Sequence, residues 1–157
     1  TRLVNYFDFG EFVLADLPGY GFAKVSKSEK ERWAKTLDSF FKNKQTIAHV
    51  FMLADSRHDP TADDVQMIKF LNHHIIPFTV VLTKADKLSR MKLKENVKAI
   101  AADLYMGVEN LLPTSAETGL GKEAVLGKIA EVIAAAEASA AEDESEEDGE
   151  EAELVRE

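Results

Sequence analysis

Two apolar runs, residues 47–54 and 77–82, constrain the fold of this chain more than any other feature. Each run has the length of a β-strand and lacks a regular polar–apolar alternation, which is typical of strands buried on both faces. A segment with apolar residues at helical spacing follows each run, at Thr61–His73 and at Ser89–Tyr105. Strands that alternate with helices predict an α/β fold with right-handed crossovers.

The segments on either side of this region extend the pattern. They are a β-hairpin formed by Leu3–Phe9 and Phe12–Ala15, a helix over Ser26–Lys44, a short strand at Leu111–Thr114 and a helix from Gly121 to about Ala141. The hairpin is expected to turn at Gly10-Glu11. Ser28 is the expected N-cap of the first helix, because Glu31 would complete a capping box with it.

The acidity of the chain is concentrated at its C-terminal end. The formal net charge is −9, and residues 142–157 contain ten acidic residues and one basic residue, so residues 1–141 are neutral. A block of like charges cannot bury apolar surface. We therefore predict a folded domain over residues 1–140 and a disordered acidic tail over residues 141–157, which is either simply solvated or docks on a partner.

Composition excludes several kinds of site. The chain has no cysteine, which excludes disulfides and thiolate chemistry and suits a reducing cytoplasm. No apolar run approaches the roughly 20 residues that a membrane helix needs, so no membrane partner is expected.

Three unusual segments follow predicted strands. They are Asp16-Leu17-Pro18-Gly19, Thr83-Lys84-Ala85-Asp86 and Ser115-Ala116-Glu117. In open α/β sheets, ligands bind at the carboxyl ends of the strands, so these segments are expected to meet at one rim. Each short motif alone is more often a turn or a surface charge than a site; their order and shared position after strands favour a joint site.

The residue types in these segments suit a guanine nucleotide. Asp16 offers a carboxylate to a hydrated Mg²⁺, and Gly19 allows a backbone N–H to approach a phosphate. The carboxylate of Asp86 can accept hydrogen bonds from the ring N–H and the amine of guanine, a pair of donors that adenine lacks. The stem of Lys84 can cover the face of the base, and the N–H of Ala116 can donate to the guanine carbonyl.

These motifs resemble those of one known family, the EngB GTP-binding proteins. Residues 16–26, DLPGYGFAKVS, look like the switch II signature of that family. Residues 55–61, DSRHDPT, followed by Asp64, are similar to the family as well, as is Thr1-Arg2 before Asn5-Tyr6-Phe7. The resemblance extends from Thr1 to about Ala138.

The resemblance implies a fold, a function and partners. The fold would be a P-loop GTPase-like (Ras-like) mixed sheet with helices on both faces, here without its first strand and first helix. The function would be that of a GTPase, which hydrolyses GTP to GDP and phosphate in large ribosomal subunit assembly, linked to normal cell division and septation. The partners would be a guanine nucleotide with Mg²⁺ and the large ribosomal subunit or its rRNA, with no DNA, in the bacterial cytoplasm.

The resemblance also implies site residues, carried over by position. The nucleotide would be bound by Thr1, Asp16, Leu17, Pro18, Gly19, Thr83, Lys84, Ala85, Asp86, Ser115, Ala116 and Glu117. Thr1 would ligate Mg²⁺ directly and Asp16 through water. Catalytic residues stay unassigned, with Gly19, Tyr20 and Lys24 of switch II as candidates. Tyr20 stands where Ras-like enzymes place a glutamine that orients the attacking water, which predicts slow intrinsic hydrolysis.

The sequence contains no GxxxxGK[ST] phosphate-binding loop. Residues 1–140 are therefore expected to form a partial G domain that is inactive alone, with unpaired sheet edges prone to aggregation. One alternative is a nucleotide-independent fragment or degenerate paralogue that binds rRNA or protein. The basic segments Lys24–Lys44 and Lys84–Lys98 would serve it, or are ordinary solvated helix faces. Asp86 and Lys84 argue against a third reading, an ATP-using P-loop protein.

Overall fold

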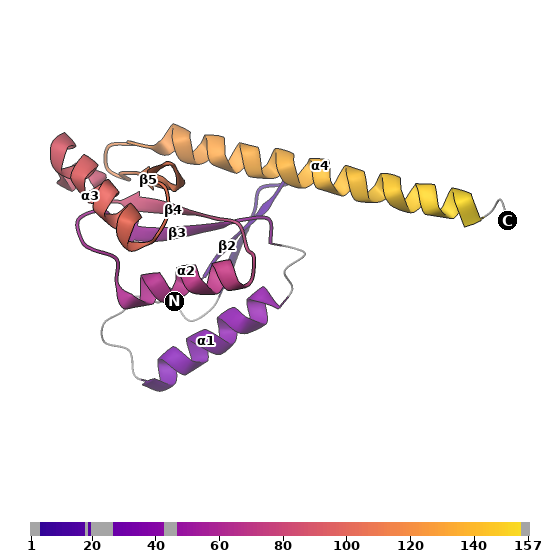
Figure 1. The fold of residues 1–157 in the computed structure, drawn as a ribbon, viewed down its shortest axis with the longest axis horizontal. Coiled ribbons are helices and arrows are strands. Elements are labelled where there is room, and N and C mark those ends of the chain that lie inside the picture. Colours follow the sequence, from indigo (N-terminus) through magenta and orange to yellow (C-terminus); the bar gives the residue numbers. More distant parts are fainter. Residues whose placement is uncertain (1–3, 18, 20–26, 43–46, 155–157) are drawn as a thin grey trace.

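A computed structural model describes residues 4–17, 19, 27–42 and 47–154, and its elements alternate as predicted (Figure 1). The strands are β1 (Asn5–Asp8), β2 (Val13–Asp16), β3 (Val50–Asp55), β4 (Phe78–Thr83) and β5 (Leu111–Pro113). The helices are α1 (Lys27–Phe41), α2 (Ala62–His73), α3 (Arg90–Asp103) and α4 (Lys122–Leu154), with short 3-10 turns η2 (Ala85–Lys87) and η3 (Val108–Asn110). The predicted α/β class with helices on both faces of the strands is confirmed.

The N-terminal strands form a hairpin that turns at the predicted position. β1 and β2 pair antiparallel, with Asp8 opposite Val13. The N–H of Phe9 donates to the carbonyl of Phe12 at 3.0 Å, which leaves Gly10-Glu11 as the turn. Gly10 has a φ of +85°, a conformation that glycine adopts without steric cost.

The remaining strands form a separate parallel sheet in the order β3-β4-β5. The register places Asp55 opposite Thr83 and Val80 opposite Leu111, so the ends of β3 and β4 are level. None of the five described strands joins the hairpin to this sheet by backbone pairing. β3 is therefore an edge strand here, and Leu53 in its middle is 63% exposed. This interruption agrees with the unpaired sheet edges that the sequence leads us to expect.

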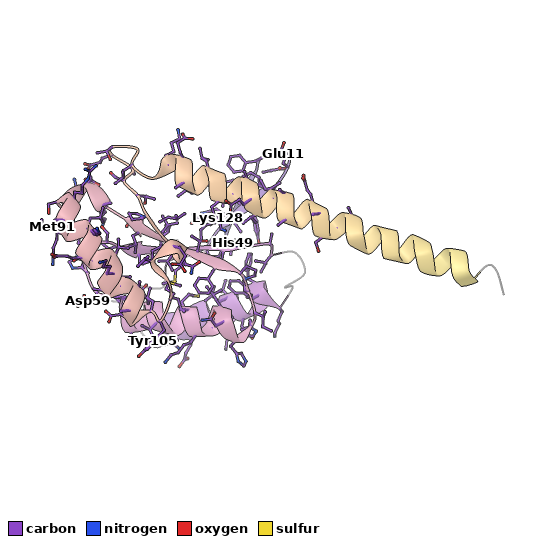
Figure 2. The ribbon with its side chains drawn as sticks, turned by 45° about the horizontal axis from the view of Figure 1, so that its top comes forward. Glu11, His49, Asp59, Met91, Tyr105 and Lys128 are labelled. Carbon is purple, nitrogen blue, oxygen red and sulfur yellow. The ribbon has the colours of Figure 1, made fainter. Side chains whose placement is uncertain are left out.

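Helices cover the parallel sheet from two sides. α1 and α2 lie on one side of the strands, and the first half of α4 lies on the other (Figure 1). His49, which precedes β3, lies near Lys128 of α4 (Figure 2). Burial lowers the pKa of His49, and the positive charge of Lys128 lowers it further. The buried core lies between α1, α2, α3 and the parallel sheet, with Leu71, Val80 and Leu82 fully buried.

α2 and α3 begin and end with recognisable caps. Thr61 and Asp64 form a capping box at the start of α2, and Ser89 caps α3 by accepting from the N–H of Lys92. Both helices end in a left-handed residue, Ile75 and Tyr105, each with a φ of 55°. Glycine is the usual residue at such a position, so both ends are strained, and both side chains are almost fully exposed.

The C-terminal helix differs from the prediction. It continues to Leu154, beyond the helix end near Ala141 that the sequence predicts. Clustered like charges prevent burial but not helix formation, and this segment consists mainly of Glu and Ala, which are strong helix formers. The added turns extend away from the body of the molecule (Figure 1). None of the helices in the described part of the chain is suited by length and apolar character to cross a membrane.

The start of the first helix also differs. α1 already includes Lys27, so Ser28 lies inside the helix rather than at its N-cap. The residue before Lys27 lies outside the described residues. Leu37 and Phe41 of this helix are buried, and Phe40 packs against the core.

Candidate nucleotide-binding site

The loop after β4 is tied to its neighbours on both sides. Thr83 ends the strand, and its hydroxyl donates to the carbonyl of Ala54 on β3 at 3.1 Å. Lys84 has a left-handed backbone with a φ of 61°, which turns the chain abruptly at the strand end. Ala85 is buried, and its N–H donates to the carbonyl of Thr114 after β5 at 2.9 Å. These bonds fix the position from which Asp86 projects.

Asp86 accepts hydrogen bonds from two side chains. The hydroxyl of Ser115 is the stronger influence and Lys87 the second, and together they lower the pKa of Asp86 below its ordinary value. The ammonium of Lys87 lies 3.0 Å from an oxygen of Asp86 and 2.9 Å from an oxygen of Glu117. The structure thus brings the predicted Thr83–Asp86 and Ser115–Glu117 segments together, and Asp86 stays a carboxylate over the neutral pH range.

The loop after β5 is a compact turn built on Ser115. Its hydroxyl accepts from the N–H of Thr118 at 3.2 Å, while its own N–H donates to the carbonyl of Leu120 at 3.0 Å. The φ of Gly121 is +76°, and a Cβ on this residue would collide with the carbonyl oxygen of Pro113. Ala116 is exposed, and its N–H has no acceptor within the described part of the chain. A free backbone donor therefore lies beside the carboxylate of Asp86.

Asp55 adds a polar cluster at the end of β3. Its carboxylate accepts from Nε of Arg57 at 2.9 Å, from Nη2 of Arg57 at 2.7 Å and from Nζ of Lys84 at 3.0 Å. These bonds, led by the one from Arg57, lower the pKa of Asp55 far below its ordinary range. The sequence alone assigned no site role to Asp55 or Arg57, which both stand in the DSRHDPT segment. The available signal was their position after a buried strand, at the edge where the other loops lie.

The Asp16–Gly19 segment is less well defined by contacts. Asp16 ends β2 and is exposed; the one described hydrogen bond of its side chain, from the amide of Asn5, is long at 3.4 Å. Leu17 packs against the core. No hydrogen bond or ion pair between described residues links Asp16 or Gly19 to the two base-side loops. Four predicted site residues lie outside the described residues: Thr1, Pro18, Tyr20 and Lys24.

A single exposed carboxylate suits one kind of metal contact. Asp16 can hold a water of a hydrated Mg²⁺, an ion that keeps several of its waters in proteins. Residues 4–17, 19, 27–42 and 47–154 contain no group of three or more ligand side chains that would hold an ion by themselves. The residues present therefore fit a metal held mainly by a nucleotide and water.

Sequence comparison finds many relatives with one description, although no protein-family model matches the chain. A probable GTP-binding protein EngB of Anoxybacillus flavithermus is 40% identical over 131 residues, 82% of this chain and 68% of the relative. The protein with the same description in Pelotomaculum thermopropionicum is 44% identical over 80% of this chain and 65% of the relative. That of Clostridium beijerinckii is 45% identical over 71% of this chain. The matched part thus spans about two thirds of the relatives' length.

Two solved structures share the fold. A crystal structure of a probable GTP-binding protein engB superposes with a TM-score of 0.72 at 23% identity, covering 84% of this chain and 82% of the other. The G-domain of FeoB from Methanococcus jannaschii superposes with a TM-score of 0.55 at 16% identity over 83% of this chain. With the sequence identities above, the conclusion is that this chain belongs to the EngB family.

Proposed function

We propose that the chain recognises the base of a guanine nucleotide and functions as a GTP-binding protein, a GTPase of the bacterial cytoplasm. The proposal is supported by the EngB relatives, whose description is GTP-binding protein. It is supported equally by the geometry of the two loops that follow β4 and β5. The observation that carries it is the pairing of one fixed acceptor, Asp86, with one free donor, the N–H of Ala116.

This pair is complementary to guanine and not to adenine. Guanine presents two donors, its ring N–H and exocyclic amine, to the carboxylate of Asp86, and its carbonyl oxygen to the N–H of Ala116. Adenine presents an acceptor and a donor in reversed positions, so both protein groups would be left unpaired. Leaving buried polar groups unpaired is the strongest way in which sites reject an analogue.

Nucleosides test this recognition directly, because they need no phosphate-binding loop. Guanosine added at millimolar concentration to the ¹⁵N-labelled chain should shift the amide resonances of Asp86 and Ala116. Inosine lacks the exocyclic amine and should bind more weakly, and adenosine should cause no such shifts. Equal shifts with guanosine and adenosine would refute the proposal.

A substitution at Asp86 sharpens the test. Asp86→Asn replaces one carboxylate oxygen by an amide donor, which suits the carbonyl that xanthine carries in place of the guanine amine. The variant should therefore bind guanosine more weakly and xanthosine more tightly than the parent. Asp63→Asn, an acidic residue in the first turn of α2, is the matched control.

We propose that phosphate and metal contacts contribute little in this chain. The sequence has no GxxxxGK[ST] motif, which elsewhere supplies the backbone nest and lysine for the phosphates. The remaining contributors to phosphate binding would be Gly19 and a Mg²⁺ ion. Asp16 would hold this ion through water, and Thr1 would ligate it directly. GDP should then bind hardly more tightly than guanosine by calorimetry; micromolar affinity for GDP would contradict this.

A role in large ribosomal subunit assembly, and through it in cell division and septation, is the wider proposal. Its physical support is the basic surface of α3, where Arg90, Lys92, Lys94 and Lys98 are exposed. Clustered cations bind RNA phosphates with an affinity that falls as salt rises. Binding to large subunits that does not change with salt would remove this support.

The same basic surface supports the second candidate, a module that binds rRNA without a nucleotide. The two functions differ in a single measurement on the subunit complex. Guanosine or GDP should change the affinity for the large subunit if the base site is in use. Asp86→Asn should abolish that change in a GTP-binding protein and have no effect in a nucleotide-independent module.

A further inference from the structure

The carboxylate of Asp55 joins two loops of the candidate site. It lies at the end of β3, level with Thr83 at the end of β4. Its own loop contributes three donors, the N–H of Arg57 at 3.0 Å and two guanidinium nitrogens, and the β4 loop contributes the ammonium of Lys84 at 3.0 Å. Both oxygens therefore accept two bonds each, and neither is left to bind a ligand. Asp55 is placed to hold other side chains.

Lys84 is fixed at both ends. Its backbone has a left-handed conformation, with a φ of 61°, which is uncommon for a residue with a side chain. Its ammonium is anchored at Asp55. The aliphatic stem between these points is thereby held in one conformation, and the side chain remains 54% exposed. A stem that is both held and exposed presents a ready surface to a flat ligand.

The contact between Asp55 and Lys84 is not needed to connect the two loops. The hydroxyl of Thr83 already donates to the carbonyl of Ala54, and the N–H of Ser56 donates to the carbonyl of Thr83 at 3.0 Å. The strands on both sides are in register throughout their length. Backbone bonds therefore hold the loops together, and the ion pair is left to direct the side chain of Lys84.

The same carboxylate of Asp55 also holds Arg57. Its guanidinium is held in a two-point contact with Asp55, a geometry that fixes its plane. The hydrogen bonds to Asp55 raise the pKa of Arg57, and the negative charge of Asp86 adds to this effect.

We propose that Asp55 is a positioning residue of the guanine site, which holds the stem of Lys84 against the purine face. This role rests on the proposed recognition of guanine by Asp86 and Ala116. It assigns Asp55 no contact with the nucleotide.

Guanosine titrations of the labelled chain, followed at the Asp86 and Ala116 amides, test the proposal with two complementary variants. Asp55→Asn removes the charge with little change of shape, and Lys84→Met keeps an unbranched stem but removes the ammonium. Each should weaken guanosine binding by about threefold to tenfold, a range typical of one lost coupling between contacting residues. Combined, they should be no worse than either alone, because both break the same contact.

A spectroscopic readout separates positioning from general damage. The Nε–H resonance of Arg57 should exchange slowly with water in the parent chain and rapidly in Asp55→Asn. Asp59→Asn, in the same loop between β3 and α2 (Figure 2), should change neither this resonance nor guanosine binding. If Asp55→Asn fails to fold, Lys84→Met probes the same contact from an exposed residue.

The possible failures are distinguishable. Parent chain that shows no guanosine-dependent shifts overturns the proposed function, and the positioning role with it. Parent chain that binds guanosine while Asp55→Asn binds it equally well overturns the positioning role alone. If the two losses of guanosine affinity add in the double variant, the positioning role is likewise overturned, since Asp55 would then act independently of Lys84.

Discussion

Among single residues, Ser115 sets the electrostatic state of the Asp86 carboxylate, for which base recognition is proposed. Its hydroxyl is the main reason why the pKa of Asp86 lies below the ordinary value. Removal of the hydroxyl in Ser115→Ala should raise that pKa toward the ordinary value, so guanosine binding should begin to fail at a higher pH on acidification. The pKa is measured from the carboxyl ¹³C shift of Asp86; an unchanged value would contradict the prediction, and Ser39→Ala, on the exposed face of α1, is the control.

Two glycines, one in the loop after β5 and one inside α4, should respond in opposite ways to alanine. Gly121 has a φ of +76° and no room for a Cβ beside Pro113, so Gly121→Ala should lower the free energy of unfolding by roughly 1–3 kcal/mol. Gly127 lies inside α4 with open space around its Cα. Gly127→Ala should raise the free energy of unfolding by roughly 0.5–1 kcal/mol. Urea denaturation measures both, and equal effects of the two substitutions would show that the turn at Gly121 is not constrained.

At this scale the sequence predicted which segments meet better than how their side chains are held. Asp86, Ser115 and Ala116 follow buried strands, and topology alone predicts that they meet. The bonds of Lys87 to Asp86 and Glu117, and of Asp55 to Lys84, depend on side-chain reach and on the left-handed turn at Lys84. No periodicity or motif encodes such contacts, because they join residues that are close only after folding.

At the scale of elements, the ends of α2 and α3 contain removable strain. Ile75 adopts a left-handed backbone although it is β-branched, and its side chain is 88% exposed, so it contributes little burial. Ile75→Gly should raise the free energy of unfolding by about 1 kcal/mol. Ile75→Ala keeps the Cβ that causes the strain and should bring no such gain. Thermal and urea denaturation compare the two, and a gain with alanine alone would point to the exposed side chain instead.

The elements themselves follow the sequence closely where apolar periodicity is strong. β3, β4, α2 and α3 lie within a few residues of their predicted bounds because buried strands and amphipathic helices have distinct patterns. The predicted end of α4 near Ala141 was wrong. No glycine or proline that could stop the helix precedes Gly149 in the acidic segment, and a charge pattern alone does not set a helix boundary.

For the whole molecule, the acidic end of α4 should affect charge far more than stability. The helix has 33 residues, a length of roughly 50 Å at its normal rise, and its last part extends away from the body (Figure 1). Deletion of residues 142–157 should change the free energy of unfolding by less than about 0.5 kcal/mol. It should reduce the helical circular dichroism signal, and solubility near neutral pH should fall because the remaining chain carries no net charge. A large loss of stability would show that this segment packs on the body.

The separation of the hairpin from the parallel sheet has a consequence for motion. β1 and β2 share hydrogen bonds only with each other among the described strands, so nothing in the backbone network obliges them to open together with β3-β4-β5. In deuterium oxide, the amides of Phe7 and Leu14, which face each other as a hydrogen-bonded pair of the hairpin, should lose their protons long before those of Val80 and Val81. Uniform exchange across both pairs would mean that the two sheets behave as one cooperative unit. Otherwise the N-terminal hairpin opens independently of the parallel sheet. A ligand or an added strand that bridged the hairpin and the sheet would then first slow the amide exchange of the hairpin.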